Sequence, residues 1–471
     1  MKPAVRLGAL GMVLCLSGAM GFVVLAGTAS ASELDGLVMV SDYVMPSKVR
    51  IFDPARSTIV FDYRLEKEGP EPCTAPEATC AALGIHHLTL QDQDYLDVAV
   101  TVIDPLKGNL ADGFYSIIQR VRLVHPVQEV WRLRELDFSD VPDGDVYCVR
   151  PPEGAEGEYR SDPRCQLAFN HAFRVVDDRP SEKRVTLIVA DTLNERVEQV
   201  TLDYSNGSHT GHVDWVLGEA HPAWPPMGVP NGVQYIDDGP DGRFLLITFY
   251  TTTWYPLGGG FLMMLKWENG DWVEAWRFPD PNDGRQPYLN TPHMGEVVVD
   301  PTTGERRIWY SHSRGLATDW REMIPAGFGA TYGMLIPGPT LADPPTYVFD
   351  AAPFLDDPER ALTFSRDQSY LPDGTMLLAD SACETMCSYT PRIYRTLRFD
   401  LDATTATDRT GCYTTDHSEL NLIPIPDDMI LDTYECGFHG IFEANWLDAD
   451  SLGTQLRNAR AGARLPCPGT R

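Results

Sequence analysis

Four histidines stand at the heads of short segments in which polar and apolar residues alternate. They are His87, His171, His293 and His439, out of eleven histidines in the chain. A neutral imidazole can move a proton, attack an electrophile or bind a metal ion near neutral pH. The alternative for each histidine is structural, namely a polar residue that caps a strand or bridges two strands by hydrogen bonds. The four histidines can act in one site only if the fold brings these distant positions together.

The segments that carry the histidines belong to a repeated unit. Its six starts are His86-His87, Asn170-His171, Asn231-Gly232, Pro292-His293, Asp367-Gln368 and Phe438-His439. Each start precedes an alternating strand that runs toward an Asp or Gly turn, and helical periodicity is nearly absent. Because successive starts are separated by enough chain for four strands, the sequence predicts an all-β fold, a six-bladed β-propeller. In such a ring the inner strands begin at one mouth of a central channel, where the histidines would meet.

The two ends of the chain complement each other. Residues 36–65 have the pattern of outer strands without a leading segment, and residues 437–447 that of a leading segment without outer strands. We therefore expect one blade to combine an inner strand from the C-terminus with three outer strands from the N-terminus. This pairing of N- and C-terminal strands removes two free sheet edges and closes the ring.

The first residues have the pattern of an export signal. Lys2 and Arg6 precede a long apolar stretch that ends in Ala29-Ser30-Ala31, the small-x-small pattern of a signal-peptidase site. The sequence thus predicts a signal peptide at residues 1–31, a β-propeller domain at residues 32–471, and a secreted or periplasmic protein. A retained membrane anchor is the alternative, because the apolar stretch is long enough to span a bilayer.

Export to an oxidising compartment favours disulfide bonds. Cys15 would be removed with the signal peptide, which leaves nine of the ten cysteines. Their spacing predicts three local disulfides: Cys73 with Cys80, Cys148 with Cys165, and Cys383 with Cys387. The last pair also suits zinc, although no second pair follows at ligand spacing. The partners of Cys412, Cys436 and Cys467 are not assigned.

The charge of the chain narrows the range of partners. The formal net charge is −29 at pH 7, which argues against nucleic acid or an anionic membrane as a partner, because both would be repelled. The segment TFYTTTWYPLGGGF at residues 248–261 is rich in aromatic residues. It either lines a pocket for a small aromatic ligand or fills space between blades.

Three stretches of the chain resemble a known family. They are LIVADTLNERVEQV (187–200), NTPHMGEVVVDPTTGERRIWYSHSRG (290–315) and LTFSRDQSYLPDGTMLLADSACETMCSYTPRIYRTLRFDLD (362–402). Together they are similar to the bacterial arylsulfotransferases, a family of six-bladed propellers. The resemblance rests on the repeated strand pattern and extends over most of the chain after the signal. It implies transfer of a sulfuryl group between two phenols through a sulfated histidine, without a nucleotide donor.

The resemblance also implies roles for individual residues. His293 stands where the family has an active-site histidine, and Arg314 lies near the place of its sulfate-binding arginine. The family's nucleophilic histidine is replaced in this chain by Asp367, and an active-site asparagine by Gly295. Another histidine, His171 or His439, would then be the nucleophile. The expected substrate-binding residues are Arg314, Arg366, Asn170 and Asn231, with an ion pair to Asp367 as the alternative for Arg366.

Two other functions suit the same fold. The first is a metal-dependent propeller lyase or lactonase, with calcium or zinc on the axis, whereas sulfuryl transfer requires no cofactor. Its candidate ligands are Asn170, His171, Asn231, His293, Asp367 and His439. The second is a non-catalytic ligand- or protein-binding propeller, in which the loops at 66–85, 136–168 and 316–346 form the contact surface.

Overall fold

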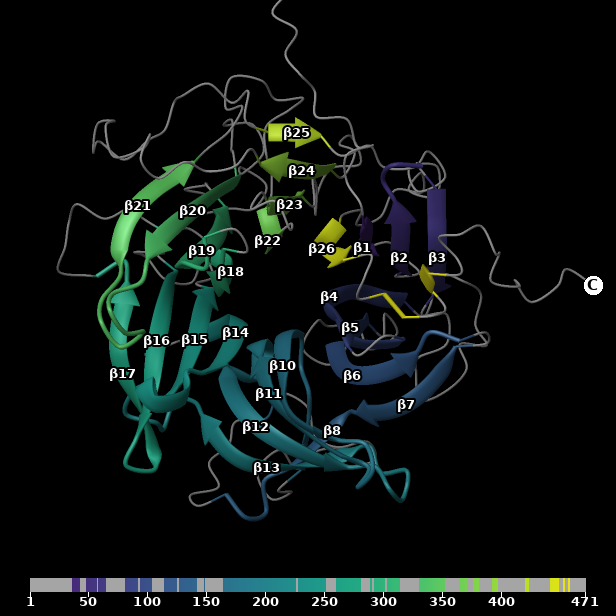
Figure 1. The fold of residues 1–471 in the computed structure, drawn as a ribbon. Coiled ribbons are helices and arrows are strands. Elements are labelled where there is room, and N and C mark those ends of the chain that lie inside the picture. Colours follow the sequence, from purple (N-terminus) through teal and green to yellow (C-terminus); the bar gives the residue numbers. More distant parts are fainter. Residues whose placement is uncertain are drawn as a thin grey trace, which may run out of the picture.

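The computed structural model shows an all-β protein whose sheets are arranged around a central axis (Figure 1). The structure describes residues 36–42, 48–56, 58–64, 81–91, 94–103, 114–124, 127–141, 148, 164–225, 228–250, 260–280, 289, 292–300, 303–313, 330–351, 365–370, 376–380, 392–396, 420–422, 441–448, 452–453 and 456–457. Within these residues the regular elements are strands, apart from short helical turns such as those at Thr192–Asn194 and Gly239–Asp241.

Six sheets make up the ring. The first contains, in spatial order, β26 (Ile441–Asp448), β1 (Gly36–Asp42), β2 (Lys48–Asp53) and β3 (Thr58–Arg64), and the second β4 (Ala81–Gln91), β5 (Tyr95–Ile103), β6 (Phe114–Arg122) and β7 (Gln128–Leu133). The third contains β10 (Asn170–Arg179), β11 (Arg184–Asp191), β12 (Arg196–Asp203), β13 (Thr210–Leu217), β8 (Glu135–Asp137) and β9 (Arg164–Gln166). The fourth contains β14 (Val229–Asp237), β15 (Arg243–Tyr250), β16 (Phe261–Glu268) and β17 (Asp271–Phe278). The fifth contains β18 (Pro292–Val299), β19 (Arg306–Ser313), β20 (Ala330–Ile336) and β21 (Thr346–Ala351), and the sixth β22 (Ser365–Tyr370), β23 (Met376–Asp380), β24 (Arg392–Thr396) and β25 (Leu420–Leu422).

The first strand of each sheet lies nearest the axis. These inner strands are β4, β10, β14, β18, β22 and β26, and each contacts the next around the ring until β26 returns to β4. The β-propeller predicted from the sequence is therefore confirmed. The expectation of six equal four-stranded blades is wrong in one respect, because five of the sheets have four strands and one has six. The two additional strands, β8 and β9, come from the connection that precedes β10 and extend that sheet at its outer edge.

The predicted pairing of the two chain ends is also confirmed. Strand β26 pairs antiparallel with β1, with Met39 opposite Asn445. The same strand bonds to both neighbouring sheets, since the side chain of Asn445 donates to the carbonyl of Leu88 and the amide of Trp446 donates to the hydroxyl of Ser369. The C-terminal strand thus completes one sheet and joins two others.

The core is divided among the spaces between adjacent sheets. In β11 the side chains of Leu187 and Val189 pack with Ile118 of the preceding sheet, whereas Ile188 packs with Leu245 of the following one. Alternation with a period of two therefore buries both faces of this strand. The aromatic segment contributes to the same kind of interface, because Phe249 and Phe261 stack with their ring centroids 4.8 Å apart, within the core between β10–β13 and β14–β17.

One of the three predicted disulfides lies within the described residues and is confirmed. Cys148 is bonded to Cys165, which precedes β10. All other cysteines, and the signal peptide expected at residues 1–31, lie outside the described residues. In the part of the chain that the structure describes, no helix is long and apolar enough to cross a membrane.

The closing strand pair makes a direct test of ring closure possible. A Cβ atom at Gly36 would overlap the indole ring of Trp446 on β26. We expect Gly36→Ala to lower the free energy of unfolding by about 1 to 3 kcal/mol, because the indole must move out of a packed site. Trp446→Phe, which removes part of the ring, should recover much of this loss when combined with Gly36→Ala. Urea unfolding of both single variants and the double variant measures the coupling, and additive losses would contradict the proposed contact.

Candidate functional site

The inner strands share a local distortion near their first residues. In β10 the register against β11 shifts between Asn170 and Ala172, which leaves His171 as the extra residue of a β-bulge. The corresponding shift falls at Asn231 in β14 and at His293 in β18. A β-bulge re-aims a side chain relative to the regular alternation of the strand and is frequent beside functional sites. Three of the predicted site residues thus occupy one equivalent position.

These three bulged residues lie close together, although they come from three successive sheets. The imidazole rings of His171 and His293 are nearly parallel, with centroids 6.4 Å apart. The side-chain amide of Asn231 donates to Nδ1 of His293 at 2.8 Å. With this bond the neutral ring of His293 carries its proton on Nε2, the atom that can donate to an anion. Phe169, whose φ is 55°, packs its ring 4.5 Å from that of His171.

Arg174 connects three sheets beside this group. Its Nη1 donates to Nε2 of His87 on β4 at 2.6 Å, and its Nη2 lies 3.4 Å from a carboxylate oxygen of Glu296 on β18. The side chains of Arg174 and Glu296 are 20% and 25% exposed. The guanidinium is therefore a half-buried cation at the inner strands, with an imidazole on one side and a carboxylate on the other.

The contacts of His87 fix its chemical state. Because arginine has only donors, Nε2 of His87 must accept the bond from Arg174. Burial lowers the pKa of His87 well below its usual 6.5, and the charge of Arg174 lowers it further, against an opposing effect of Glu296. His87 is thus a neutral imidazole that positions Arg174. Its register also differs from the prediction, since it lies one residue beyond the second of two register shifts in β4, which falls between Ile85 and His87.

A buried carboxylate fixes the segment that leads into β10. Asp191, at the end of β11, accepts bonds from the amide of Ala168 at 2.7 Å, the side chain of Asn194 at 2.6 Å and the guanidinium of Arg196 at 3.0 Å. Burial raises the pKa of Asp191, and these partners oppose the rise. Asp191 and Arg196, on either side of the turn at Thr192–Asn194, therefore have a structural role. The carboxylate holds the chain in place at Ala168, three residues before His171.

Asn170 takes part in the same scaffold. Its side chain is fully buried and donates to the carbonyls of Ala172 and Ala190 at 3.1 and 2.8 Å. Its backbone amide donates to the hydroxyl of Ser116 on β6 at 2.8 Å. These bonds join β10 to β11 and to the preceding sheet. Asn170 thus has a structural role, and its expected role in binding substrate stays a prediction.

The remaining predicted site residues fall wholly or partly outside the described part of the chain. Arg314 and His439 lie outside the described residues, and of Arg366 only the backbone, in β22, is described. The expected register of four histidines therefore holds for His171 and His293, whereas His87 is displaced by one residue and His439 lies outside the described residues.

The expected alternative with calcium or zinc on the axis requires at least three clustered ligands. Among the described residues, no three His, Cys, Asp or Glu side chains are grouped so that they could hold a metal ion. Nε2 of His87 and Nδ1 of His293 are engaged by Arg174 and Asn231. The metal alternative stays a prediction, because the side chains of Asp367 and His439 lie outside the described part of the chain.

The sequence did not single out Arg174 or Glu296. Both lie three residues beyond the bulged histidine of their strand, Arg174 after His171 and Glu296 after His293. This common spacing, with opposite charges on two inner strands of a ring, is the signal that could have found them. A charged residue within an inner strand is unusual enough to suggest a partner across the ring.

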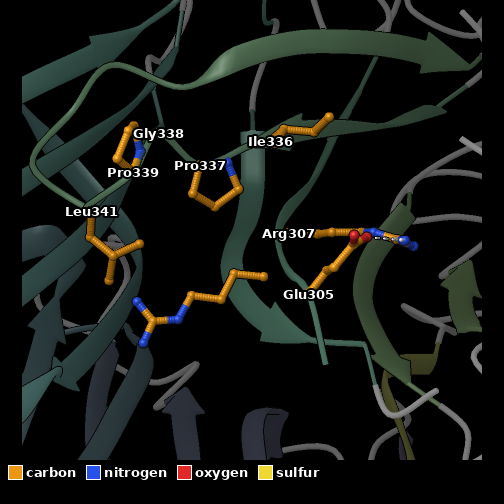
Figure 2. A pocket seen from close by; sticks show the side chains of 8 residues that line it. Glu305, Arg307, Ile336, Pro337, Gly338, Pro339 and Leu341 are labelled. Carbon is orange, nitrogen blue, oxygen red and sulfur yellow. Dashed lines mark hydrogen bonds and ion pairs between the residues drawn. The ribbon is translucent and has the colours of Figure 1, made fainter. Parts of the chain in front are cut away.

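A pocket of about 340 Å³ lies away from this cluster (Figure 2). It is lined by residues at the start of β19, at the end of β20 and in the segments next to them, among them Glu305, Arg306, Arg307, Ile336 and Leu341. Strand β18 starts near His293 and ends before this pocket, so the two sites lie at opposite ends of that strand. Arg307 pairs with Asp300 at 3.0 Å and Arg306 pairs with Asp238, which balances the charges of both arginines within the protein.

Comparisons with known proteins identify solved structures with a similar arrangement of the chain. A putative 6-phosphogluconolactonase from Bacteroides fragilis is 12% identical, with a TM-score of 0.40, and the match covers 88% of this chain and 98% of that protein. A putative 6-phosphogluconolactonase from Bacteroides uniformis is 10% identical, with a TM-score of 0.38, and the match covers 88% of this chain and 100% of that protein. Hydrazine synthase from Kuenenia stuttgartiensis is 11% identical, with a TM-score of 0.36, and the match covers 79% of this chain and 89% of that protein. No protein-family model and no curated protein matches the chain. The resemblance to the arylsulfotransferases therefore stays a prediction.

The state of His87 predicts a specific dependence of stability on pH. The unfolded chain binds a proton at His87 below a pH of about 6.5, whereas the folded protein, with its lowered pKa, does not. The contribution of His87 to the free energy of unfolding should therefore fall by about 1.4 kcal/mol per pH unit below that value, until the folded pKa is reached. His87→Gln should remove this part of the dependence.

Urea unfolding of the wild type and of His87→Gln between pH 7.5 and 5 measures the effect. Other titrating groups, such as Asp97, whose pKa burial raises to about 6, are present in both proteins and cancel in the difference. Parallel curves for the two proteins would show that His87 takes up a proton in the folded state.

The role of Asp191 predicts a local and a global effect of its removal. Asp191→Ala leaves the guanidinium of Arg196 buried beside fewer acceptors, and we expect the free energy of unfolding to fall by about 3 kcal/mol. Hydrogen exchange should also become faster at residues 168–172, which the carboxylate fixes. Asp203→Ala, an exposed aspartate at the end of β12, is the matched control and should change neither quantity appreciably. Equal losses in both variants would exclude a special role for Asp191.

Proposed function

We propose that this protein is an exported sulfuryl transferase that moves a sulfuryl group from an aryl sulfate to a second phenol. The observation that carries the proposal is the stacking of His171 on β10 with His293 on β18, with the cation of Arg174 three residues beyond His171 on the same strand. Arg174 supplies a positive charge, and Nε2–H of His293 supplies a donor. A positive charge and an N–H donor both favour binding of an anionic group, and both stabilise the charge on its oxygens in the transition state.

His171 is the nucleophile in this proposal. His171 is half-buried, whereas His87 and His293 are 4% to 5% exposed. It occupies the bulged position next to the donor of His293. These features favour His171 over the other described histidines, and Asp367 stands where the resemblance would place a nucleophile.

The reaction then has two balanced steps. In the first, a ring nitrogen of His171 forms a bond to sulfur, the bond from sulfur to the aryl oxygen breaks, and the phenolate leaves with that electron pair and takes a proton from solvent. In the second, the acceptor phenol loses its proton to solvent and its oxygen forms a bond to sulfur, while the bond from nitrogen to sulfur breaks and its electron pair returns to the ring. Arg174 and His293 hold the sulfuryl oxygens in both steps.

A non-catalytic anion-binding propeller is the second candidate. The observation that favours it is the burial of Nε2 in both His171 and His293, because attack on sulfur requires access to a ring nitrogen. In that function the same residues hold an anionic aromatic ligand without turnover. A metal-dependent lyase or lactonase has no comparable support in the described residues.

The two candidates are separated by a transfer assay with the purified mature chain, para-nitrophenyl sulfate as donor and phenol as acceptor. We expect release of nitrophenol that depends on the acceptor, together with formation of phenyl sulfate. His171→Ala should reduce the rate to that of buffer. Arg174→Ala should reduce kcat/KM by about 100-fold, as for the loss of one preorganised donor.

The matched control is His212→Ala, which removes a half-exposed histidine on the outer strand β13. It should retain the wild-type rate. Binding of the donor without any phenyl sulfate formation between pH 6 and 9 would rule out the transferase and leave the binding propeller.

A further inference from the structure

Glu296 is an acidic side chain beside the cation that the proposed function uses. It lies on β18, three residues beyond His293, and its carboxylate oxygen Oε1 is 3.4 Å from Nη2 of Arg174 on β10. Strand β14 lies between β10 and β18 around the ring and contacts both. The ion pair therefore reaches past β14, as the stacking of His171 with His293 does.

Arg174 is held by uncharged groups as well as by Glu296. Its Nη1 donates to Nε2 of His87 at 2.6 Å and to the carbonyl of Phe173 at 3.1 Å. His87 carries no charge near neutral pH, because burial keeps its pKa well below 6.5. The contact with Glu296 is longer than these two bonds. The orientation of the guanidinium is therefore set mainly by its neutral partners, and Glu296 chiefly contributes a negative charge.

The formal charges of this group cancel. Arg174 contributes one positive charge, Glu296 one negative charge, and His87 none. The side chains of Arg174 and Glu296 are 20% and 25% exposed, so solvent and salt screen their charges only in part. An anion that approaches Arg174 is attracted by the guanidinium and repelled by the carboxylate. Glu296 thus lowers the net attraction that the site offers to an anion.

The charge of a ligand decides whether it can bind against this reduced attraction. Its Coulomb energy in the field of Arg174 and Glu296 is proportional to its charge. The cost of removing an ion from water, in contrast, rises with the square of its charge, so a dianion costs about four times as much as a monoanion of equal size. An aryl sulfate is a monoanion, whereas an aryl phosphate carries about two negative charges above neutral pH. A weakened cation site therefore favours the sulfate.

We propose that Glu296 is a specificity-determining residue, which makes the site at Arg174 accept monoanionic aryl sulfates and reject dianionic aryl phosphates. The inference rests on the proposed function for the place of the ligand beside Arg174. It deepens that function, because it names the class of ester that the site excludes. Since it concerns binding, it can be tested apart from transfer.

The test is isothermal titration of the mature chain at pH 8.5 with benzenesulfonate, a monoanion, and phenylphosphonate, a dianion. Neither ligand has an aryl oxygen that can leave, so neither is turned over. We expect the wild type to bind phenylphosphonate with a Kd at least about 10-fold higher. Glu296→Gln, which keeps the shape and removes the charge, should lower the Kd by about 5-fold for benzenesulfonate and about 25-fold for phenylphosphonate, because the dianion gains twice the free energy.

Two further variants separate the local charge from other effects. Glu274→Gln removes one negative charge from an exposed position on the outer strand β17, and it should leave the ratio of the two Kd values unchanged. Glu296→Asp keeps the charge and should keep the preference for benzenesulfonate. Urea unfolding at pH 8.5 shows whether each variant is folded, and Glu296→Ala takes the place of Glu296→Gln if the latter is not.

Three results overturn the inference. The first is a wild type that binds phenylphosphonate as tightly as benzenesulfonate, the second a wild type that binds neither, and the third a folded Glu296→Gln whose two Kd values have the wild-type ratio. If that ratio falls in Glu296→Gln and no phenyl sulfate forms in the transfer assay, the inference holds and the proposed transfer reaction fails. If phenyl sulfate forms and the ratio is unchanged, the transfer reaction stands and the inference fails.

Discussion

The ring must close before any of its inner-strand residues can meet. Closure depends on antiparallel pairing between β26 and β1, which lie at opposite ends of the sequence. Side-chain and backbone bonds from Asn445 and Trp446 then join this sheet to both neighbours. Around this ring β10 and β18 lie on either side of β14, and Arg174 bonds to His87 and Glu296. One long-range strand pair thus completes the ring whose inner strands carry these contacts.

Within that ring, buried polar groups act at two levels. Asp191 and Asn170 use their side chains to fix backbone segments, so that the start of β10 has one conformation. His87 uses its lone pair to hold Arg174, and Asn231 selects the tautomer of His293. Groups of the first kind are fully committed within the fold. Groups of the second kind orient another side chain, namely the guanidinium of Arg174 and the imidazole of His293. Preorganised anion sites are built from donors and charges that are oriented in this way.

Much of the fold could be predicted because the sequence repeats. The inner strands that contain His87, His171, Asn231 and His293, and the shared blade of the two termini, follow from period-two alternation and turn residues. The additional strands β8 and β9 could not be predicted, since they are short and lie in a connection without alternation. The site was predicted less well, because a β-bulge shifts a side chain by one residue and leaves no clear sequence signal. That shift separates His86 from His87, and the pairing of Arg174 with Glu296 depends on the closed ring.

The distribution of the hydrophobic core between adjacent sheets has a consequence for how the protein unfolds. Each face of β11 packs on a different neighbour, with Leu187 in one cluster and Ile188 in the next. A blade therefore has no separate hydrophobic core, and it is not an autonomous folding unit as a domain is in a chain of tandem domains. Unfolding of one blade would expose the apolar side chains that its two neighbours pack against it. Such a chain is expected to melt as a whole, and evolution can vary its connecting loops far more freely than the number of its blades.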